Sequence, residues 1–185
     1  LIMDDVIIYS KEILNTLELA KALDNKKIIV LFTKHDIKNK ELLKELQEKT
    51  SLQLKAGLLV TNVKEAQKYN AQYILFGEAT RDLVENKLIT HIFNAEIIEH
   101  KDKTHRRGSG INQVIAKLLS DKEKTYCFNL HTLLYDNQAQ ILGRIEQNKK
   151  ILRKYDCKIV CYSFAEKPLE LRAKKERKLF LEQNL

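Results

Sequence analysis

Short apolar runs alternate with helix-length segments along most of this chain, and this alternation constrains the fold more than any other feature. The first two runs are 6–9 and 28–32, and the segment 12–23 between them carries apolar residues on one helical face. Strands of parallel sheets that are buried on both faces have such near-continuous apolar runs. Short turns between strand and helix are typical of βα units. The pattern therefore predicts a parallel sheet covered by helices.

Eight strands can be counted in this way. They are expected at 6–9, 28–32, 52–60, 71–76, 89–93, 96–99, 125–130 and 158–162. Helices are expected at 12–23, 39–49, 63–69, 80–87, 111–119 and 139–155, and in the tail from 169 onward. Two closures are compatible with this order, a (β/α)8-like barrel with some helices shortened and an open doubly wound sheet. The count of eight favours the TIM-like barrel, and the lack of a Pro/Gly/Ser-rich linker predicts one domain over residues 1–185.

Basic residues are concentrated in the second half of the chain. The 185 residues carry a formal net charge of +8. Residues 1–100 contain 14 Lys and Arg against 15 Asp and Glu, whereas residues 101–185 contain 19 against 10. This asymmetry indicates a polyanion-binding surface, most simply for nucleic acid. The alternative is that lysine-rich helices are ordinary solvated faces.

The cysteines and the hydropathy pattern indicate a cytoplasmic protein. The three cysteines have no CxxC spacing, which favours a reducing compartment over a disulfide framework. No apolar run approaches the length of a membrane span, and the first residues lack the features of a secretory signal. We therefore expect no membrane association.

A search for catalytic residues finds no constellation. The five histidines do not stand in HxH, HxxxH or HExxH spacing, and GxSxG, GxxxxGK and GxGxxG motifs are absent. A barrel can assemble ligands from separate strand ends, so convergence of His91, His131 and Asp36 stays open. We expect no catalytic residue, no metal and no bound cofactor, with a metal-dependent barrel phosphoesterase as the alternative.

The segment 106–119 combines the only closely spaced glycine pair, Gly108 and Gly110, with two preceding arginines and a following amphipathic stripe. A flexible turn with free N–H groups at a helix start, beside Arg106 and Arg107, suits a phosphate. The alternative is a structural turn in which Ser109 caps the helix and the arginines are merely solvated.

Two further basic clusters lie downstream. Lys149, Lys150, Arg153 and Lys154 crowd the end of the longest helix; its C-terminal dipole would account for one or two of them, so four indicate a cationic face. The second cluster comprises Arg172, Lys174, Lys175, Arg177 and Lys178. Because few aromatic residues are interleaved, the pattern favours contact with the backbone of folded nucleic acid over stacking on single strands.

At these residues the chain resembles a known family. The sequence RGSGINQVIAK at 107–117 resembles the signature R-x-S-G-[LI]-N-x-[VL]-x-A-K of ribonuclease P protein component 3, the archaeal counterpart of a subunit shared by eukaryotic RNase P and RNase MRP. The strand at 125–130, Arg144 with the helix end at 152–155, and the segment 159–172 follow in the family's order. Phe164 departs from the pattern, since a small residue is usual between Ser163 and Ala165, and Ala173 stands near where a proline is usual.

The resemblance implies a barrel related to the PHP phosphoesterases but without their metal site. It also implies a protein subunit of an endoribonuclease, RNase P, which removes 5′ leaders from precursor tRNA. The partners implied are the RNase P RNA, RNase P protein component 2 and other RNase P proteins, with cleavage left to the RNA and its Mg²⁺. A plain protein-interaction scaffold is the rival from another class.

The residues expected to contact RNA are drawn from the turn and from the two basic clusters, with Arg144 in addition. They are Arg106, Arg107, Ser109, Gly110, Asn112, Arg144, Lys149, Lys150, Arg153, Lys154, Arg172, Lys174 and Lys175. Ser109, Gly110 and Asn112 are expected to shape or cap the turn, or to donate to a phosphate. Arg144 is expected either to contact RNA or to form a structural ion pair.

Overall fold

The strands form a single parallel sheet that curls into a barrel. The computed structural model describes residues 3–38, 41–99, 101–102, 104–105, 107–134 and 137–183. The strands are β1 (Asp5–Ile8), β2 (Lys27–Phe32), β3 (Gln53–Val60), β4 (Ile74–Glu78), β5 (His91–Phe93), β6 (Thr125–Asn129) and β7 (Lys158–Tyr162). They pair in sequential order, each parallel to the next. The predicted parallel β/α barrel is confirmed, and the open doubly wound order is excluded.

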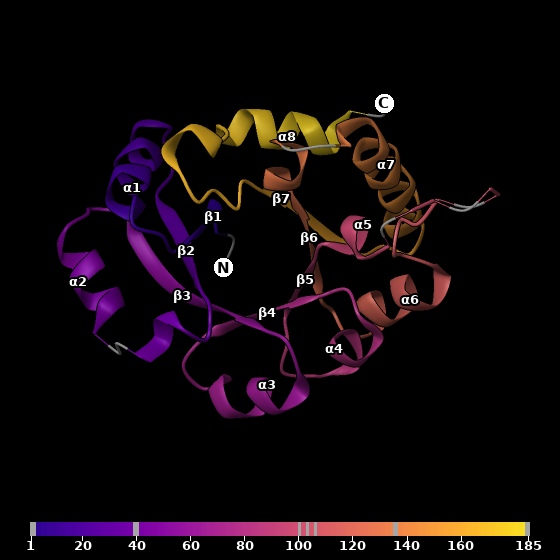
Figure 1. Ribbon diagram of the computed structural model, residues 1–185, viewed down its shortest axis with the longest axis horizontal. Coiled ribbons are helices and arrows are strands. Elements are labelled where there is room, and N and C mark those ends of the chain that lie inside the picture. The colour runs from indigo at the N-terminus through magenta and orange to yellow at the C-terminus, as the bar shows by residue number, and fades with distance from the viewer. Residues whose placement is uncertain are drawn as a thin grey trace.

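Helices cover the outside of the ring, as Figure 1 shows in a view along the barrel. The α-helices are α1 (Ile13–Ala22), α2 (Leu42–Glu48), α3 (Val63–Tyr69), α4 (Arg81–Glu85), α5 (Ala95–Ile98), α6 (Gln113–Asp121), α7 (Gln138–Lys154) and α8 (Lys174–Glu182). Short 3₁₀ turns are η1 (Asp36–Lys38), η2 (Leu130–Leu134) and η3 (Pro168–Glu170). The predicted bounds of 63–69 are confirmed, and Asn62 caps that helix by accepting a hydrogen bond from the backbone N–H of Glu65.

The expected eighth strand at 96–99 is wrong, because these residues lie in α5. The chain leaves β5 at Asn94 with φ of 61°, a left-handed conformation that starts the helical turn. The ring closes instead through the segment after β7. Ile7 of β1 forms a parallel bridge with Ala165, and the N–H of Ile8 donates to the carbonyl of Ala165 at 2.9 Å. Seven strands and this bridging segment therefore nearly close the barrel.

Aromatic side chains fill the barrel interior near the carboxyl ends of its strands. Phe164 follows β7 with φ of 49°, is fully buried, and stacks on Phe93 with ring centroids 5.0 Å apart. The rings of Phe76 and Tyr162 also contact the Phe164 ring, both in an edge-on arrangement. The departure from the family pattern at Phe164 thus places a large ring inside the barrel.

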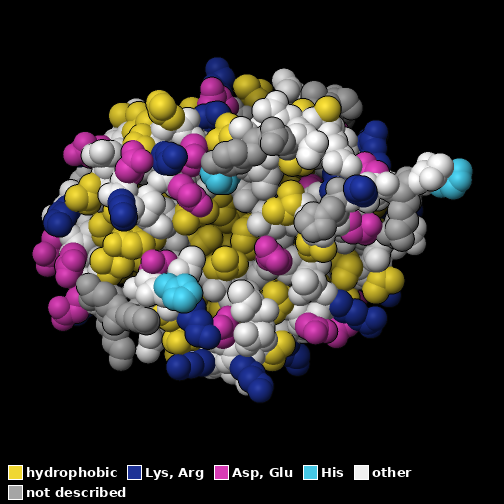
Figure 2. Space-filling view, in the orientation of Figure 1, with side chains coloured by type: hydrophobic (Ala, Val, Ile, Leu, Met, Phe, Trp, Pro, Cys, Tyr) yellow, Lys and Arg dark blue, Asp and Glu magenta, His cyan; other side chains and the backbone are white. Residues whose placement is uncertain are grey.

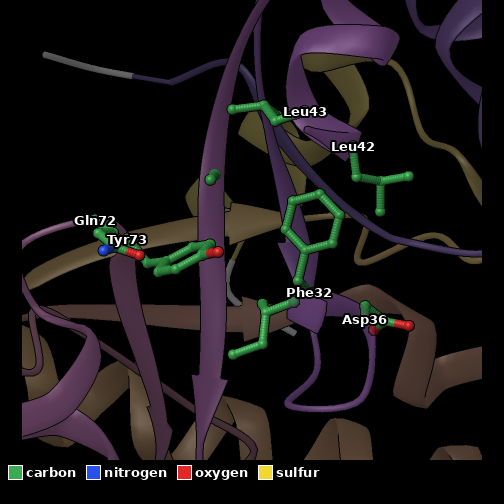
Figure 3. A pocket seen from close by; sticks show the side chains of 8 residues that line it. Phe32, Asp36, Leu42, Leu43, Gln72 and Tyr73 are labelled. Atoms are coloured by element: carbon green, nitrogen blue, oxygen red, sulfur yellow. The ribbon is translucent and has the colours of Figure 1, made fainter. Parts of the chain in front are cut away.

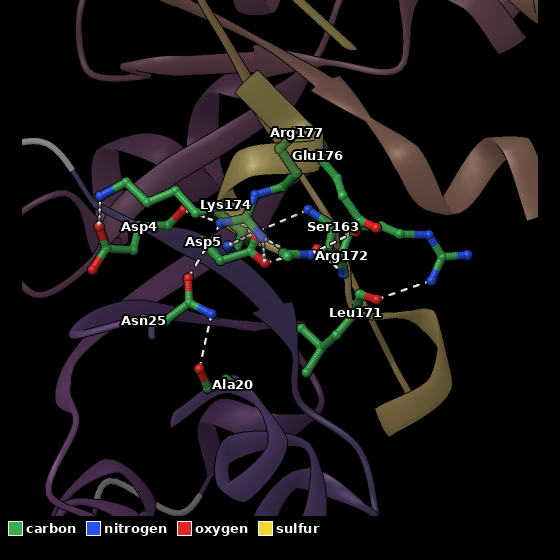
Figure 4. A network of polar contacts seen from close by, with 12 residues as sticks. Asp4, Asp5, Ala20, Asn25, Ser163, Leu171, Arg172, Lys174, Glu176 and Arg177 are labelled. Atoms are coloured by element: carbon green, nitrogen blue, oxygen red, sulfur yellow. Dashed lines mark hydrogen bonds and ion pairs between the residues drawn. The ribbon is translucent and has the colours of Figure 1, made fainter. Parts of the chain in front are cut away.

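A buried ion pair attaches α8 to the strands where the ring closes. Arg177 of α8 and Asp5 of β1 are both almost fully buried, and their charged atoms lie 2.8 Å apart (Figure 4). Asp5 also accepts hydrogen bonds from the backbone and the hydroxyl of Ser163, both at 2.7 Å. Burial raises the pKa of Asp5 to about 6, against the lowering by Arg177 and Ser163. The network ties the first strand, the closing segment and the last helix together.

Among the described helices, none is both long enough and apolar enough to cross a membrane.

Candidate nucleic-acid interface

The turn at 107–112 is built on close backbone contacts that require its glycines. Gly110 has φ of 75°, and a Cβ at this position would lie 2.3 Å from the carbonyl oxygen of Ala95. A Cβ at Gly108 would lie 2.7 Å from Cβ of Glu99. The glycine pair therefore lets the turn lie directly against α5 and the residue that follows it.

Asn112, and not Ser109, caps the helix that follows the turn. The side-chain oxygen of Asn112 accepts a hydrogen bond of 2.9 Å from the backbone N–H of Ile115 in α6. Ser109 is buried, and its carbonyl accepts from the side-chain amide of Asn148 at 2.7 Å. Ser109 and Gly110 thus shape the turn, and the alternative interpretation in which Ser109 is the N-cap is wrong. Arg106 lies outside the described residues.

Arg107 is held at the surface by α7. Its Nη1 donates a 2.8 Å hydrogen bond to the carbonyl of Gly143, and a Cβ at Gly143 would lie only 3.0 Å from that nitrogen. The side chain is exposed and lines a cavity of about 210 Å³. Asn112 and Gln147 also line this cavity. An exposed guanidinium that is fixed by one backbone acceptor keeps its other donors for a ligand.

Arg144 is buried and serves as the structural centre of the site. Its Nε and Nη2 lie 2.9 and 2.8 Å from Oδ1 of Asp102, and Nη1 donates to the carbonyls of Glu96 and Glu99 at 2.7 and 2.6 Å. The N–H of Gly108 donates to the same Asp102 oxygen at 2.6 Å. This bond and the Arg144 side chain lower the pKa of Asp102. Of the two roles left open for Arg144, the structure supports the ion pair.

A buried polar network beneath the turn was missed by the sequence analysis. Asn148 of α7 donates to Glu96 at 2.8 Å as well as to the carbonyl of Ser109, and the hydroxyl of Tyr126 lies 2.9 Å from both Glu96 carboxylate oxygens. Burial raises the pKa of Glu96, whereas Asn148, Tyr126 and Arg144 lower it. The available signal was Asn148 standing one helical turn from Arg144, among the buried residues of α7. The network fixes α5, the turn and α7 relative to one another.

The basic face predicted on α7 is only partly present. Lys149 is 1% exposed, and its ammonium donates to Glu146 at 2.7 Å and to the carbonyls of Phe180 and Gln183 in and after α8. Arg153 donates to the carbonyl of Leu181. These two cations therefore satisfy carbonyl groups at the C-terminal end of α8. The expectation that the Lys149 ammonium is available to RNA is wrong, while Lys150 and Lys154 are exposed.

The basic cluster near the C-terminus also divides into bound and available groups. Arg172 donates to the carbonyls of Leu169 and Leu171 at 3.1 and 2.9 Å. The exposed Lys174 lies 2.8 Å from Asp4. Lys175 is exposed, and its ammonium group makes no hydrogen bond or ion pair with a described residue.

Of the cations predicted to contact RNA, four are exposed and have no carboxylate partner among the described residues. They are Arg107, Lys150, Lys154 and Lys175. Ile151 lines the cavity beside Arg107, so Lys150 and Lys154 stand within one turn of the cavity wall on α7. On the barrel end drawn in Figure 2, by contrast, Lys and Arg alternate with Asp and Glu around the rim, and hydrophobic side chains occupy the hollowed centre.

The histidines proposed as alternative metal ligands do not converge. His91 begins β5 and stacks on Phe76 with ring centroids 4.6 Å apart, while His131 lies after β6 and pairs with Glu170 at 3.3 Å. In a parallel barrel the starts and ends of strands are at opposite openings. Within the ranges that the structure describes, no group of three or more His, Cys, Asp or Glu side chains is placed to hold a metal ion.

Asp36, the third of these candidate ligands, lines a separate cavity of about 250 Å³ beside β2 and β3 (Figure 3). Its carboxylate accepts from the backbone and the hydroxyl of Thr33 at 2.8 and 2.7 Å. The remaining lining, which includes Phe32, Leu42 and Tyr73, is mainly apolar. The Asp36 carboxylate thus stabilises the turn between Thr33 and Asp36.

Comparison with known proteins places the fold. No family model and no curated protein matches the sequence. The chain is similar in structure to a chain in the cryo-EM structure of archaeal ribonuclease P with mature tRNA, with a TM-score of 0.81 and 20% identity over 97% of this chain and 82% of that chain. It is also similar to histidinol phosphate phosphatase from Lactococcus lactis, complexed with zinc, L-histidinol and phosphate, with a TM-score of 0.65 and 10% identity over 97% and 93% of the two chains. The fold is therefore a TIM/PHP-like barrel.

Proposed function

We propose that this chain is a protein subunit of ribonuclease P, of the component 3 type, that binds the RNA of that complex in the cytoplasm. The observation that carries the proposal is the construction of the 107–112 turn. Gly108, Gly110 and Asn112 each have a defined part in building it, and its product is one exposed, fixed guanidinium on Arg107. The similarity to a chain of archaeal ribonuclease P supports the same assignment.

The chemistry assigned to the chain is binding. Arg107 offers planar donors to phosphate oxygens, and Lys150, Lys154 and Lys175 add point charges that release counterions on binding. The cleavage of precursor tRNA is assigned to the RNA and its Mg²⁺, with RNase P protein component 2 as the sister protein. None of the described residues is proposed as catalytic.

Binding of RNase P RNA at several salt concentrations tests this proposal. In Arg107→Gln the affinity falls for specific RNA, and the slope of log K against log salt becomes shallower by about one, because one phosphate contact is lost. Lys64→Gln is the matched control, because Lys64 is exposed on α3 and has no ion pair with a described residue. Equal affinity and slope for wild type and Arg107→Gln would favour the scaffold alternative instead.

A further inference from the structure

A large cavity lies at the opening formed by the amino ends of the strands. Its volume is about 550 Å³, within the range of about 300–1,000 Å³ that small-molecule sites occupy. The proposed RNA interface makes no use of it. Met3, Ile29, Ile74, Val160 and Tyr162 supply most of its apolar wall.

Strand register shows which polar side chains point into this opening. Phe76, a residue of the barrel interior, pairs with His91, which pairs with Thr125, which pairs with Lys158. Paired residues of a parallel sheet share one face, so this row faces inward. Lys55 pairs with the interior residue Ile29 and belongs to the same inner surface.

The polar groups of the cavity are hydrogen-bond donors, and two of them are charged. The ammonium groups of Lys55 and Lys158 make no hydrogen bond or ion pair with any residue in the described ranges, and both residues line the cavity. Burial lowers the pKa of His91 to about 4, so its imidazole is neutral at pH 7. No described Asp or Glu lines the cavity. Asp4 pairs with Lys174 and Asp5 with Arg177.

From this arrangement we infer that the amino-end opening of the barrel binds an amphiphilic carboxylate, with its head group at Lys55 and Lys158 and its apolar body against Ile29, Ile74 and Val160. The two ammonium groups, which have no carboxylate partner among the described residues, supply the positive charge that an anionic head group needs. The apolar wall gains from covering a hydrocarbon body. This site is independent of the RNA-binding proposal and lies at a different part of the barrel from Arg107.

Dodecanoate below its micelle concentration is the probe, and the methyl group of Met3 is the reporter. Met3 is the only methionine among the 185 residues and lines the cavity, so a protein labelled at the methionine methyl gives one NMR signal from the site. Calorimetry measures the affinity in parallel. Dodecanoate is expected to bind saturably and to shift the Met3 signal, and dodecanol is expected to bind about tenfold more weakly or worse.

The variant Lys55→Gln/Lys158→Gln separates charge recognition from apolar contact. Its dodecanoate affinity is expected to fall about tenfold or more, to the level of dodecanol, while dodecanol binding is unchanged. Lys64→Gln is the control and retains full dodecanoate affinity. The single variant Lys158→Gln alters an exposed residue, so it tests the same point should the double variant fail to fold.

Four results would overturn the inference. The first three are absence of saturable dodecanoate binding to wild type, equal affinity for dodecanoate and dodecanol, and full dodecanoate affinity in the folded Lys158→Gln and double variants. Displacement of dodecanoate by a 5′-phosphorylated RNA, together with loss of RNA affinity in the double variant, would assign these lysines to RNA and would also overturn it.

Discussion

The Nη1 of Arg107 donates a 2.8 Å hydrogen bond to the backbone carbonyl of Gly143, so the turn before α6 and the middle of α7 are joined at the surface. The guanidinium lies so close to α7 that a Cβ at Gly143 would meet Nη1 at 3.0 Å and Cζ at 3.1 Å. This glycine is therefore a positioning residue for Arg107. Its role can be separated from fold stability, because alanine is the better residue for a helix interior.

Gly143→Ala is expected to change stability and RNA binding in opposite directions. Alanine favours a helix interior by about 1 kcal/mol over glycine, so the unfolding free energy is expected to rise or stay level. The added methyl group displaces the Arg107 guanidinium, so RNA affinity is expected to fall about threefold or more. Urea unfolding and RNA titration of the same preparation measure both effects. Unchanged RNA affinity would show that the position of the guanidinium on α7 does not matter.

Gly110→Ala is expected to destabilise the protein by about 1–3 kcal/mol or more, since it combines a positive φ with a clash against a backbone oxygen. Gly77→Ala is the matched control. A Cβ there would meet only side chains of Ile89 and Leu83, at 3.3 Å, so a smaller loss is expected. Denaturant midpoints compare the two variants. Equal losses would contradict the packing of the turn against α5.

The neighbouring residues Lys149 and Lys150 are expected to give opposite phenotypes. Lys149→Ala leaves Glu146 and the α8 carbonyls without their buried cation, so a loss of about 3–5 kcal/mol of stability is expected. Lys150→Ala is expected to change stability by about 0.5 kcal/mol or less and to make the salt slope of RNA binding shallower by about one. Thermal unfolding and salt-dependent titration distinguish them. An RNA-binding effect without a loss of stability in Lys149→Ala would contradict its burial and support the cationic face predicted from the sequence.

His91 is expected to make folding sensitive to acid. Its folded pKa of about 4 lies below the ordinary value of 6.5, because burial disfavours the imidazolium. Between these values the unfolded chain binds a proton that the folded protein does not, so this contribution to stability is complete above pH 6.5 and is lost as the pH falls toward 4. The stability lost over this pH range is on the order of 3 kcal/mol.

His91→Phe retains an aromatic ring against Phe76 and removes the titrating group. The difference in unfolding free energy between wild type and this variant is expected to change in favour of the variant as the pH is lowered from 7 to 4. Urea unfolding across that range measures it. A difference that is constant with pH would contradict the burial of a neutral imidazole.

The positions of most strands and their parallel arrangement were predictable from the sequence, because buried parallel strands have apolar runs that short-range patterns reveal. The helical structure of segment 96–99 was not predictable. It depends on the left-handed turn at Asn94 and on the burial of Glu96 against Tyr126 and Asn148. Both are tertiary effects. The run of apolar residues around it had no feature that separates a short strand from a single helical turn.

The sequence was enough to predict the turn at 107–112, but not the buried polar network on which the turn rests. The glycine pair, Asn112 and Arg107 are adjacent in sequence, so their local roles follow from the motif. Lys149 was misassigned because Lys149 and Lys150 have equal charge in sequence, and only the docking of α8 decides which ammonium is buried. The polar network needs contacts between residues about 40 to 50 positions apart, such as the bonds from Asn148 to Ser109 and Glu96.

Cleavage of precursor tRNA by reconstituted RNase P at limiting Mg²⁺, with the sister protein present, tests the central claim most directly. Adding this chain is expected to raise the cleavage rate, and adding Arg107→Gln is expected to raise it clearly less, while Lys64→Gln acts as wild type. The wild-type advantage is expected to shrink as Mg²⁺ is increased, because cations of either kind offset repulsion between RNA phosphates. A cleavage rate that is the same with and without this chain at every Mg²⁺ concentration would contradict the assignment.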